Sequence, residues 1–292
     1  MSAVSIELRD GIAWVRIDNP PVNALGQAVR AGLRDVAAEI DGDENVQAVV
    51  LHSAGAMFVA GADIQELGMP PLDPSLPDVI AAIEGSRVPW VAAINGHALG
   101  GGLELAMACH ARIAHKAARL GLPEVTLGTI PGAGGTVRLP RLVPMPVAIG
   151  MVTGGKPIEP SAALQAGLID AIAQSDLLIE AEALAHGLTA GRPPTTLEKP
   201  LRALDGVDWP SLKREIIAKA RGASAPGEAS RRCAKVPNCH PTKLSGANAN
   251  ASCVCRYPRK RPLSDMPSAP SGKPAGACAE SRRSRPTWRV WV

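Results

Sequence analysis

The hydrophobic pattern along residues 1–229 changes its period repeatedly, as it does in α/β proteins. Short apolar runs rich in β-branched residues are typical of strands buried on both faces. Apolar residues three and four positions apart are typical of helices with one buried face. The predicted strands are a hairpin over 6–17 that turns at Asp10-Gly11, and the runs 48–51, 90–94 and 111–114. The predicted helices are 27–40, a short helix or turn at 64–69, a helix opened by the glycines at 100–102, and 160–166, 176–190 and 210–221.

Strands that alternate with helices favour an α/β fold with a parallel or mixed sheet covered by helices. The pattern stops near residue 229, where the composition also changes. Residues 230–292 hold eight prolines, five of the six cysteines and 13 basic against two acidic residues, whereas residues 1–229 hold 18 basic and 25 acidic residues. Such a segment is typical of a disordered chain. We therefore predict a main domain over 1–200, a helical extension over 201–229 and a disordered, basic, Pro- and Cys-rich tail over 230–292.

Two functional interpretations compete with a tail that has no function. The spacings Cys233-x5-Cys239 and Cys253-x-Cys255 differ from those of structural zinc sites. A basic arm could hold nucleic acid through its charge alone. We favour the tail without function, and we expect neither a metal nor a nucleic-acid partner.

The chain ends and the composition also predict where the protein works. Residues 1–10 read as a strand rather than as a basic stretch leading into an apolar run, so we expect no secretory signal. No uninterrupted apolar stretch approaches the roughly 20 residues that span a bilayer. The last residues, Trp291-Val292, do not form a Ser-Lys-Leu peroxisomal address. We therefore expect a cytoplasmic protein without a membrane partner.

The first of three segments with possible chemistry is Phe58-Val59-Ala60-Gly61-Ala62-Asp63-Ile64. Small residues directly after a strand let the backbone approach a ligand, and exposed N–H groups there can hold a developing anion. The alternative is a plain strand-to-helix turn in which Asp63 is the N-cap.

The second segment runs from Asn95 to Glu104 and places Gly100, Gly101 and Gly102 at the start of a helix. Glycines leave N–H groups uncovered at the positive end of the helix dipole, where an oxyanion or a phosphate can bind. The segment lacks the Lys-Ser/Thr of a phosphate loop and the spacing of a dinucleotide fingerprint. Glu104 lies in the first turn, so its alternative role is to complement the dipole.

The third segment runs from Leu122 to Thr136 and carries a single acid, Glu124, among apolar, proline and glycine residues. A partly desolvated carboxyl group has a raised pKa, which suits acid–base chemistry near neutral pH. The alternative is an exposed loop glutamate.

In this order and with these spacings, the three segments resemble the enoyl-CoA hydratase/isomerase (crotonase) family over about residues 5–200. The resemblance implies a spiral of β-β-α repeats with a helical C-terminal part. Family members commonly form trimers or dimers of trimers. We therefore expect a homo-oligomer of the trimer type if the C-terminal part folds.

The resemblance also implies roles for residues of the first two segments. In the family, the Ala-Gly-Ala-Asp segment supplies one N–H of an oxyanion hole and the middle glycine before the helix supplies the other. Here these would be Ala60 and Gly101, which would polarise the thioester carbonyl. The residues that match the family's coenzyme A site are Ala24, Ala62, Asp63 and Ile64. Coenzyme A is part of the acyl-CoA substrate, so no separate cofactor is expected.

Glu104 and Glu124 match the two glutamates that family hydratases use as acid and base. Two carboxyl groups that flank one water can deliver that water to C3 and a proton to C2 of the 2,3-double bond. Many relatives keep one glutamate and perform isomerisation or other enolate chemistry, so the presence of both favours trans-2-enoyl-CoA hydration in fatty-acid β-oxidation. A 3,2-enoyl-CoA isomerase, another reaction of this type, or a truncated inactive remnant are the alternatives.

Three further stretches resemble the N-terminal hydratase half of multifunctional fatty-acid oxidation enzymes: 19–24, 109–114 and 154–158. Those enzymes continue into an NAD-dependent dehydrogenase, but no Gly-x-Gly-x-x-Gly follows residue 229 here, so we expect no NAD chemistry. We hypothesise that translation leaves the family's reading frame near residue 229. The hypothesis fails if neither of the other two frames encodes a helical linker and a dinucleotide fingerprint.

Overall fold

The computed structural model describes residues 2–66, 69–201, 208–219 and 223–235. Its main sheet has six strands in the order β1-β2-β3-β4-β6-β8. β1 and β2 form the predicted hairpin in antiparallel pairing, and every later neighbour pairs in parallel. The strands are β1 (Val4–Arg9), β2 (Ile12–Ile17), β3 (Ala48–Ser53), β4 (Trp90–Ile94), β6 (Ala111–Ala114) and β8 (Ala171–Ile172).

A second, small sheet holds two strands that the sequence pattern did not predict, β5 (His97–Leu99) and β7 (Arg119–Gly121), in parallel pairing. β5 directly follows β4, and β7 directly follows β6, so successive segments place one strand in each sheet. An isolated bridge joins Val59 to Ala98 and adds the chain after β3 to the edge of this sheet. Helix α3 (Gly101–Ala108) begins at the end of β5, which places its N-terminus beside this small sheet.

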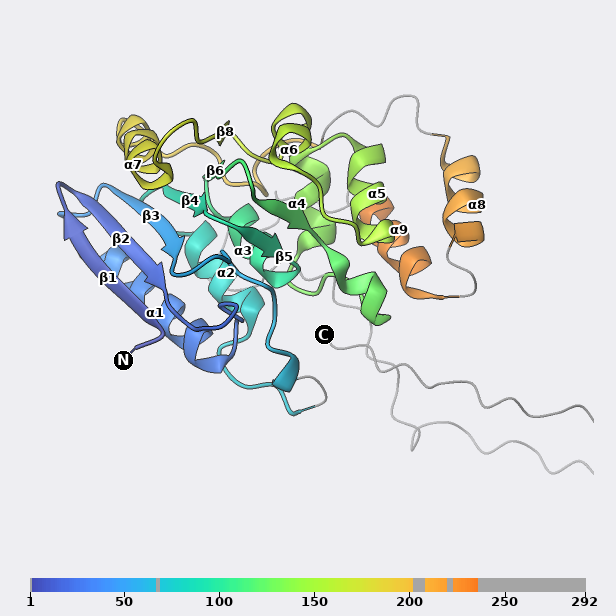
Figure 1. The fold of residues 1–292 in the computed structure, drawn as a ribbon, viewed down its shortest axis with the longest axis horizontal. Helices are drawn as coiled ribbons and strands as arrows, with labels where there is room; N and C mark the ends of the chain where they lie inside the picture. Colours follow the sequence, from blue (N-terminus) through green and yellow to red (C-terminus); the bar gives the residue numbers. More distant parts are fainter. Residues whose placement is uncertain (1, 67–68, 202–207, 220–222, 236–292) are drawn as a thin grey trace, which may run out of the picture. The chain divides into compact units, whose positions relative to one another are not determined.

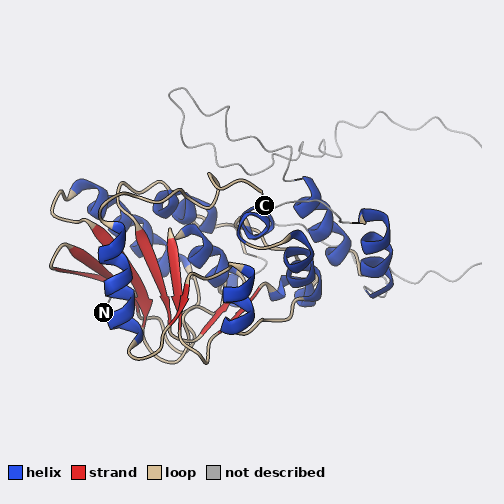
Figure 2. Ribbon diagram, turned by 90° about the horizontal axis from the view of Figure 1, so that it is seen from above, coloured by secondary structure: helices blue, strands red, loops and turns tan. Residues whose placement is uncertain are grey.

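Helices cover both faces of the main sheet, as Figure 2 shows. Because side chains alternate along a strand, β2, β3 and β4 send every second residue to each face. One set packs with helices α1 (Gln27–Gly42), α2 (Leu76–Glu84) and α3 in the larger core. The other set packs against α7 (Leu177–Leu188) in a smaller core. The predicted mixed sheet covered by helices is confirmed.

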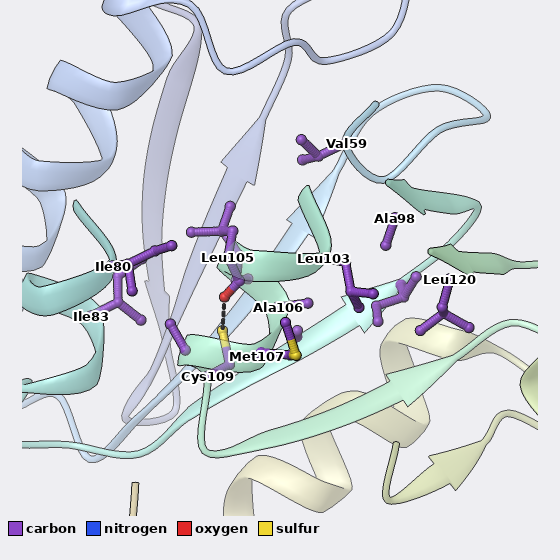
Figure 3. Close-up of a cluster of buried hydrophobic side chains, with 14 of the residues drawn as sticks. Val59, Ile80, Ile83, Ala98, Leu103, Leu105, Ala106, Met107, Cys109 and Leu120 are labelled. Carbon is purple, nitrogen blue, oxygen red and sulfur yellow. Dashed lines mark hydrogen bonds between the residues drawn. The ribbon is translucent and has the colours of Figure 1, made fainter. Parts of the chain in front are cut away.

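Helix α3 lies inside the larger core, and each of its eight residues is buried. Figure 3 shows Leu103, Leu105 and Met107 of α3 among side chains from other parts of the chain, such as Ile80 and Leu120. A helix buried on all sides has no amphipathic period, and its position is set by packing alone. The site residues at its N-terminus are therefore held on a rigid element.

Residues after β7 form short helices that pack beside the sheet (Figure 1). Pro160 at the first position of α6 and Gly167 at φ +85° after its end explain why its bounds match the predicted helix. These elements are the 3-10 turn η2 (Pro123–Leu127) and the helices α4 (Gly135–Leu142), α5 (Met145–Gly154), α6 (Pro160–Ala166), α8 (Trp209–Lys219) and α9 (Ala225–Lys235). Another 3-10 turn, η1 (Ile64–Glu66), lies earlier in the chain, between β3 and α2. No helix among the described residues is long and apolar enough to cross a membrane.

The domain boundary predicted near residue 229 lies inside α9. α9 packs against α5, and its residues Ala229 and Cys233 are fully buried. Burial raises the pKa of the Cys233 thiol to about 12. The order between residues 225 and 235 therefore extends the folded part of the chain six residues past residue 229. The predicted disorder of 236–292 lies outside the described residues.

Candidate active site

The three glycines at the start of α3 allow the chain after β3 to lie directly against this helix. A Cβ added at Gly102 would lie 2.3 Å from the carbonyl oxygen of Val59, and one added at Gly101 would lie 2.8 Å from Cδ2 of Leu76. Gly100 adopts φ +52°, which favours glycine. Small residues at these positions are thus required by packing, and the same packing places backbone N–H groups from two segments side by side.

Two N–H groups that have no acceptor among the described residues lie at this contact, those of Ala62 and Gly101. A Cβ added at Gly101 would lie 3.5 Å from the nitrogen of Ala62, so the two amides are neighbours. Gly101 opens α3, where an N–H has no intrahelical acceptor. Neither N–H has a hydrogen-bond acceptor within the described ranges. This pair can donate two hydrogen bonds to one oxygen atom of a ligand.

The prediction for Ala60 needs correction. Its N–H donates to the carbonyl oxygen of Val22 at 3.1 Å, so it is already satisfied inside the protein. The Ala-Gly-Ala segment offers two alanine amides, and the contact with Val22 removes the first of them. Gly61 between them has φ +119°, which favours glycine at this position. The structure therefore assigns to Ala62 the position that sequence reasoning gave to Ala60.

Glu104 is buried at the N-terminus of a second helix, α4. Its Oε1 accepts hydrogen bonds from the N–H groups of Ala133 at 2.9 Å and Gly135 at 2.7 Å, and only 2% of the residue is exposed. A Cβ added at Gly135 would lie 3.0 Å from this oxygen, so glycine permits the close approach. The carboxyl group is thus bound by α4 in addition to lying in the first turn of α3.

Glu124 lies in η2 and carries a buried oxygen without a partner. Its Oε2 is inaccessible and makes no hydrogen bond in the part of the chain that the structure describes. A Cβ added at Gly100 would lie 3.1 Å from Oε1, which places this carboxyl group at the N-terminus of α3. Thr126 and Leu127 beside it are exposed, but Glu124 points inward, so the alternative of an exposed loop glutamate is wrong.

Burial raises the pKa values of both acids. Burial is the largest effect on Glu124, and the charge of Glu104 adds to it, so its pKa rises to about 8. Burial also raises the pKa of Glu104, but the N–H groups of Gly135 and Ala133 and the charge of Arg138 oppose the increase. The N–H groups and Arg138 thus favour the ionised form of Glu104, whereas burial and the charge of Glu104 favour the protonated form of Glu124.

The segments predicted to bind coenzyme A lie beside these amides. The N–H of Leu25, next to Ala24, donates to the carbonyl oxygen of Gly61 at 2.9 Å. Asp63 accepts from the N–H of Gln65 at 2.9 Å and so caps η1, as the alternative interpretation of that segment expected. The segments that contain Ala24 and 62–64 are thus brought together, although the structure does not test their role in binding.

Sequence reasoning missed the residues that hold this region in place. Arg30 is buried and donates to the carbonyl oxygens of Leu25, Leu72 and Pro74. It also pairs with Glu66 at 2.7 Å. These contacts span up to 44 residues in sequence, and no local spacing signals them.

The comparison with known families agrees with this geometry. Residues 7–199 match the family described as enoyl-CoA hydratase/isomerase. The chain belongs to this family. The match covers the three segments discussed above and ends before α8, so it contains both acids and both amides of the candidate site. The predicted crotonase-like spiral of β-β-α repeats with a helical C-terminal part is confirmed.

The chain is similar both to long bifunctional enzymes and to a shorter hydratase. A peroxisomal bifunctional enzyme of Danio rerio is 40% identical over 224 residues, which cover 75% of this chain and 31% of that protein. A probable enoyl-CoA hydratase of Bacillus subtilis (strain 168) is 40% identical over 213 residues and is covered to 82% by a match that spans 70% of this chain. The chain therefore spans about a third of the length of the bifunctional relative.

A solved structure shows the same fold. The crystal structure of an enoyl-CoA hydratase from Bacillus anthracis superposes with a TM-score of 0.62 at 31% identity. The match covers 76% of this chain and 90% of that one. The predicted resemblance to the hydratase half of multifunctional enzymes is likewise confirmed by the bifunctional relatives.

Proposed function

We propose that the chain hydrates trans-2-enoyl-CoA thioesters. The observation that carries the proposal is the joint position of two buried acids and two free amides at the N-terminus of α3. The amides of Ala62 and Gly101 can bind the thioester oxygen, which gains negative charge in the transition state. Glu104 and Glu124 lie next to these amides, where the C2–C3 double bond of the same substrate would lie.

The different environments of the acids suggest their roles. Glu104 accepts two N–H bonds that favour its ionised form, so it acts as the base that removes a proton from water. The hydroxyl oxygen then forms a bond to C3. Glu124 has a pKa raised to about 8, so it is protonated at pH 7 and donates its proton to C2. Proton exchange between the two carboxyl groups and water restores the starting state.

Turnover of trans-2-butenoyl-CoA by the purified full chain tests the proposal through the loss of absorbance of the conjugated double bond. Hydration should be lost in Glu104→Gln and in Glu124→Gln alike.

The isomerase alternative requires only one acid, Glu124, because one carboxyl group beside the amide pair can move a proton between C2 and C4. If Glu104→Gln isomerises 3-enoyl-CoA at the wild-type rate and the wild type hydrates nothing, the chain is an isomerase. Folded protein that turns over neither substrate indicates the inactive remnant.

The cellular role rests on the relatives. Because proteins named peroxisomal bifunctional enzyme and peroxisomal fatty acid beta-oxidation multifunctional protein are similar to this chain, we place the proposed hydration step in fatty-acid β-oxidation. A cytoplasmic location and a trimer-type assembly stay predictions. Cell fractionation and light scattering of the purified chain test them, and a peroxisomal or a monomeric protein would contradict them.

A further inference from the structure

Arg138 and Glu84 form a buried ion pair directly behind the loop that binds Glu104. Nε and Nη2 of Arg138 donate to the two carboxylate oxygens of Glu84 at 3.2 and 2.6 Å. Both side chains are 8% exposed. Paired contacts of this kind fix the plane of the guanidinium group as well as its position. The pair ties the end of α2 to the first turn of α4.

The guanidinium group also determines the shape of the loop. Its third nitrogen, Nη1, donates to the carbonyl oxygen of Ala133 at 3.1 Å. Gly134 adopts φ +103°, and a Cβ added there would lie 2.0 Å from Nη1, so the loop rests directly on the arginine. The residues on either side of Gly134 are Ala133 and Gly135, whose N–H groups bind Oε1 of Glu104. One side chain thus supports both donors to the proposed base.

Glu84 is held from further segments. The N–H of Leu197 donates to its Oε1 at 3.4 Å, and Nη1 of Arg192 donates to its carbonyl oxygen at 3.3 Å. Removing either member of a buried pair leaves an uncompensated charge, which costs more than removing both. Retention of such a pair next to a reactive group needs a reason beyond stability, because apolar residues of equal volume stabilise a core at least as well.

We propose that Arg138 and Glu84 are positioning residues that set the orientation and the charge of Glu104 through the 133–135 loop. The inference rests on the proposed function, because it treats Glu104 as the group that activates water. The alternative is a purely structural role, in which the contact between the two side chains joins α2 to α4. In that case the 133–135 loop would have no effect on the reaction.

The charges around Glu104 define the expected sign. Arg138 from α4 lowers the pKa of Glu104, and Glu124 from η2 interacts with it as a neighbouring acid. Glu84 from α2 lies behind Arg138, and Arg192 lies beyond Glu84. Removing the positive charge of Arg138 should therefore raise the pKa of Glu104. The acidic limb of the kcat profile, which reports ionisation of the base, should move to higher pH.

Four variants of the full chain separate positioning from structure: Arg138→Met, Arg138→Lys, Glu84→Gln and the control Asp170→Asn. The control breaks another pair, in which Asp170 contacts the fully buried Arg112 at 3.2 Å away from the 133–135 loop. Arg138→Met should lower kcat roughly 10- to 100-fold, as loss of an outer hydrogen-bond partner of a ligand does at metal sites, with KM within about twofold. Its acidic limb should move to higher pH.

The other variants have distinct expected results. Arg138→Lys keeps the charge but loses the paired contact, so the acidic limb should stay in place while kcat falls. Glu84→Gln should lower kcat without moving the limb to higher pH. Asp170→Asn should lower only the melting temperature.

Titration of the Glu104 carboxyl carbon by NMR, assigned with Glu104→Gln, measures the same shift without turnover. If the wild type hydrates nothing, the proposed function fails, and this titration still decides the inference. An unchanged pKa of Glu104 and an unmoved kcat limb in Arg138→Met would overturn it. If Arg138→Met does not fold, wild-type kcat in both Arg138→Lys and Glu84→Gln would overturn it equally.

Discussion

Helices α3 and α7 differ in how the N–H groups of their first turns are hydrogen-bonded. We expect this difference to distinguish the candidate site at α3 from the structural role of α7. At α7, Asp176 accepts hydrogen bonds from the N–H groups of Leu178 at 2.8 Å and Ile179 at 3.1 Å. At α3, the N-cap is Gly100, which has no side chain to accept them, and two acidic side chains lie close by. Asp176 thus satisfies the first amides of α7, whereas the first amide of α3 has no acceptor among the described residues.

The cost of this arrangement is local. A buried donor and a buried carboxyl oxygen that each lack a partner among the described residues destabilise the folded state. Residues that break local rules in this way are expected at functional sites, because the ligand supplies the missing partner. The comparison between the two helix starts predicts large effects on turnover at α3 and effects on stability alone at α7.

The largest effect is expected from the acids at α3. Glu104→Gln and Glu124→Gln should each lower kcat for hydration about 10²- to 10⁴-fold, because each removes one proton transfer. Steady-state kinetics with 2-butenoyl-CoA measures this, and Glu159→Gln on the surface, whose side chain is 66% exposed, is the control. Wild-type kcat in either variant would show that the acid it replaces takes no part in hydration.

A smaller loss is expected from the amide that the structure assigns to ligand binding. Ala62→Pro removes the N–H and should lower kcat about 10²- to 10³-fold, whereas Ala62→Ser keeps the N–H and should stay near wild type. The same assay applies, with circular dichroism to confirm folding. Equal activity of the two variants would remove Ala62 from the proposed oxyanion hole.

The raised pKa of Glu124 should make the free energy of unfolding depend on pH. Its pKa is about 8 in the folded chain against an ordinary value of 4.5, so the folded state keeps a proton that the unfolded state has lost. The free energy of unfolding should therefore fall as pH rises from about 4.5 to about 8. Glu124→Gln should flatten this slope in denaturant titrations at several pH values. An identical slope in the variant would contradict the raised pKa.

The smallest effect is expected at α7. Asp176→Ala removes the side-chain cap and should lower the free energy of unfolding by about 1 kcal/mol, with kcat unchanged. Denaturant unfolding and the hydration assay measure the two quantities together. A loss of kcat at constant stability would show that α7 takes part in the site.

Elements with local signals were predicted well. The hairpin turns at Asp10-Gly11, and α6 lies between Pro160 and Gly167, so residues within one turn of each end decide these elements. α4 and α5 were missed because α4 contains Pro140 and α5 is apolar without amphipathic spacing. β5 was missed because three residues form a strand here only through pairing with β7.

The sequence by itself determined the family and predicted the two acids and Gly101 as site residues, because spacing along the chain carries that information. Only the tertiary structure decided between Ala60 and Ala62, since the carbonyl oxygen of Val22, 38 residues away, occupies one amide and leaves the other free. The different environments of Glu104 and Glu124 likewise come from distant groups, the 133–135 loop with Arg138 and Glu84 on one side and burial without a partner on the other. Burial and hydrogen bonding are properties of the folded chain, so two glutamates that look alike in sequence acquire different environments only when it folds.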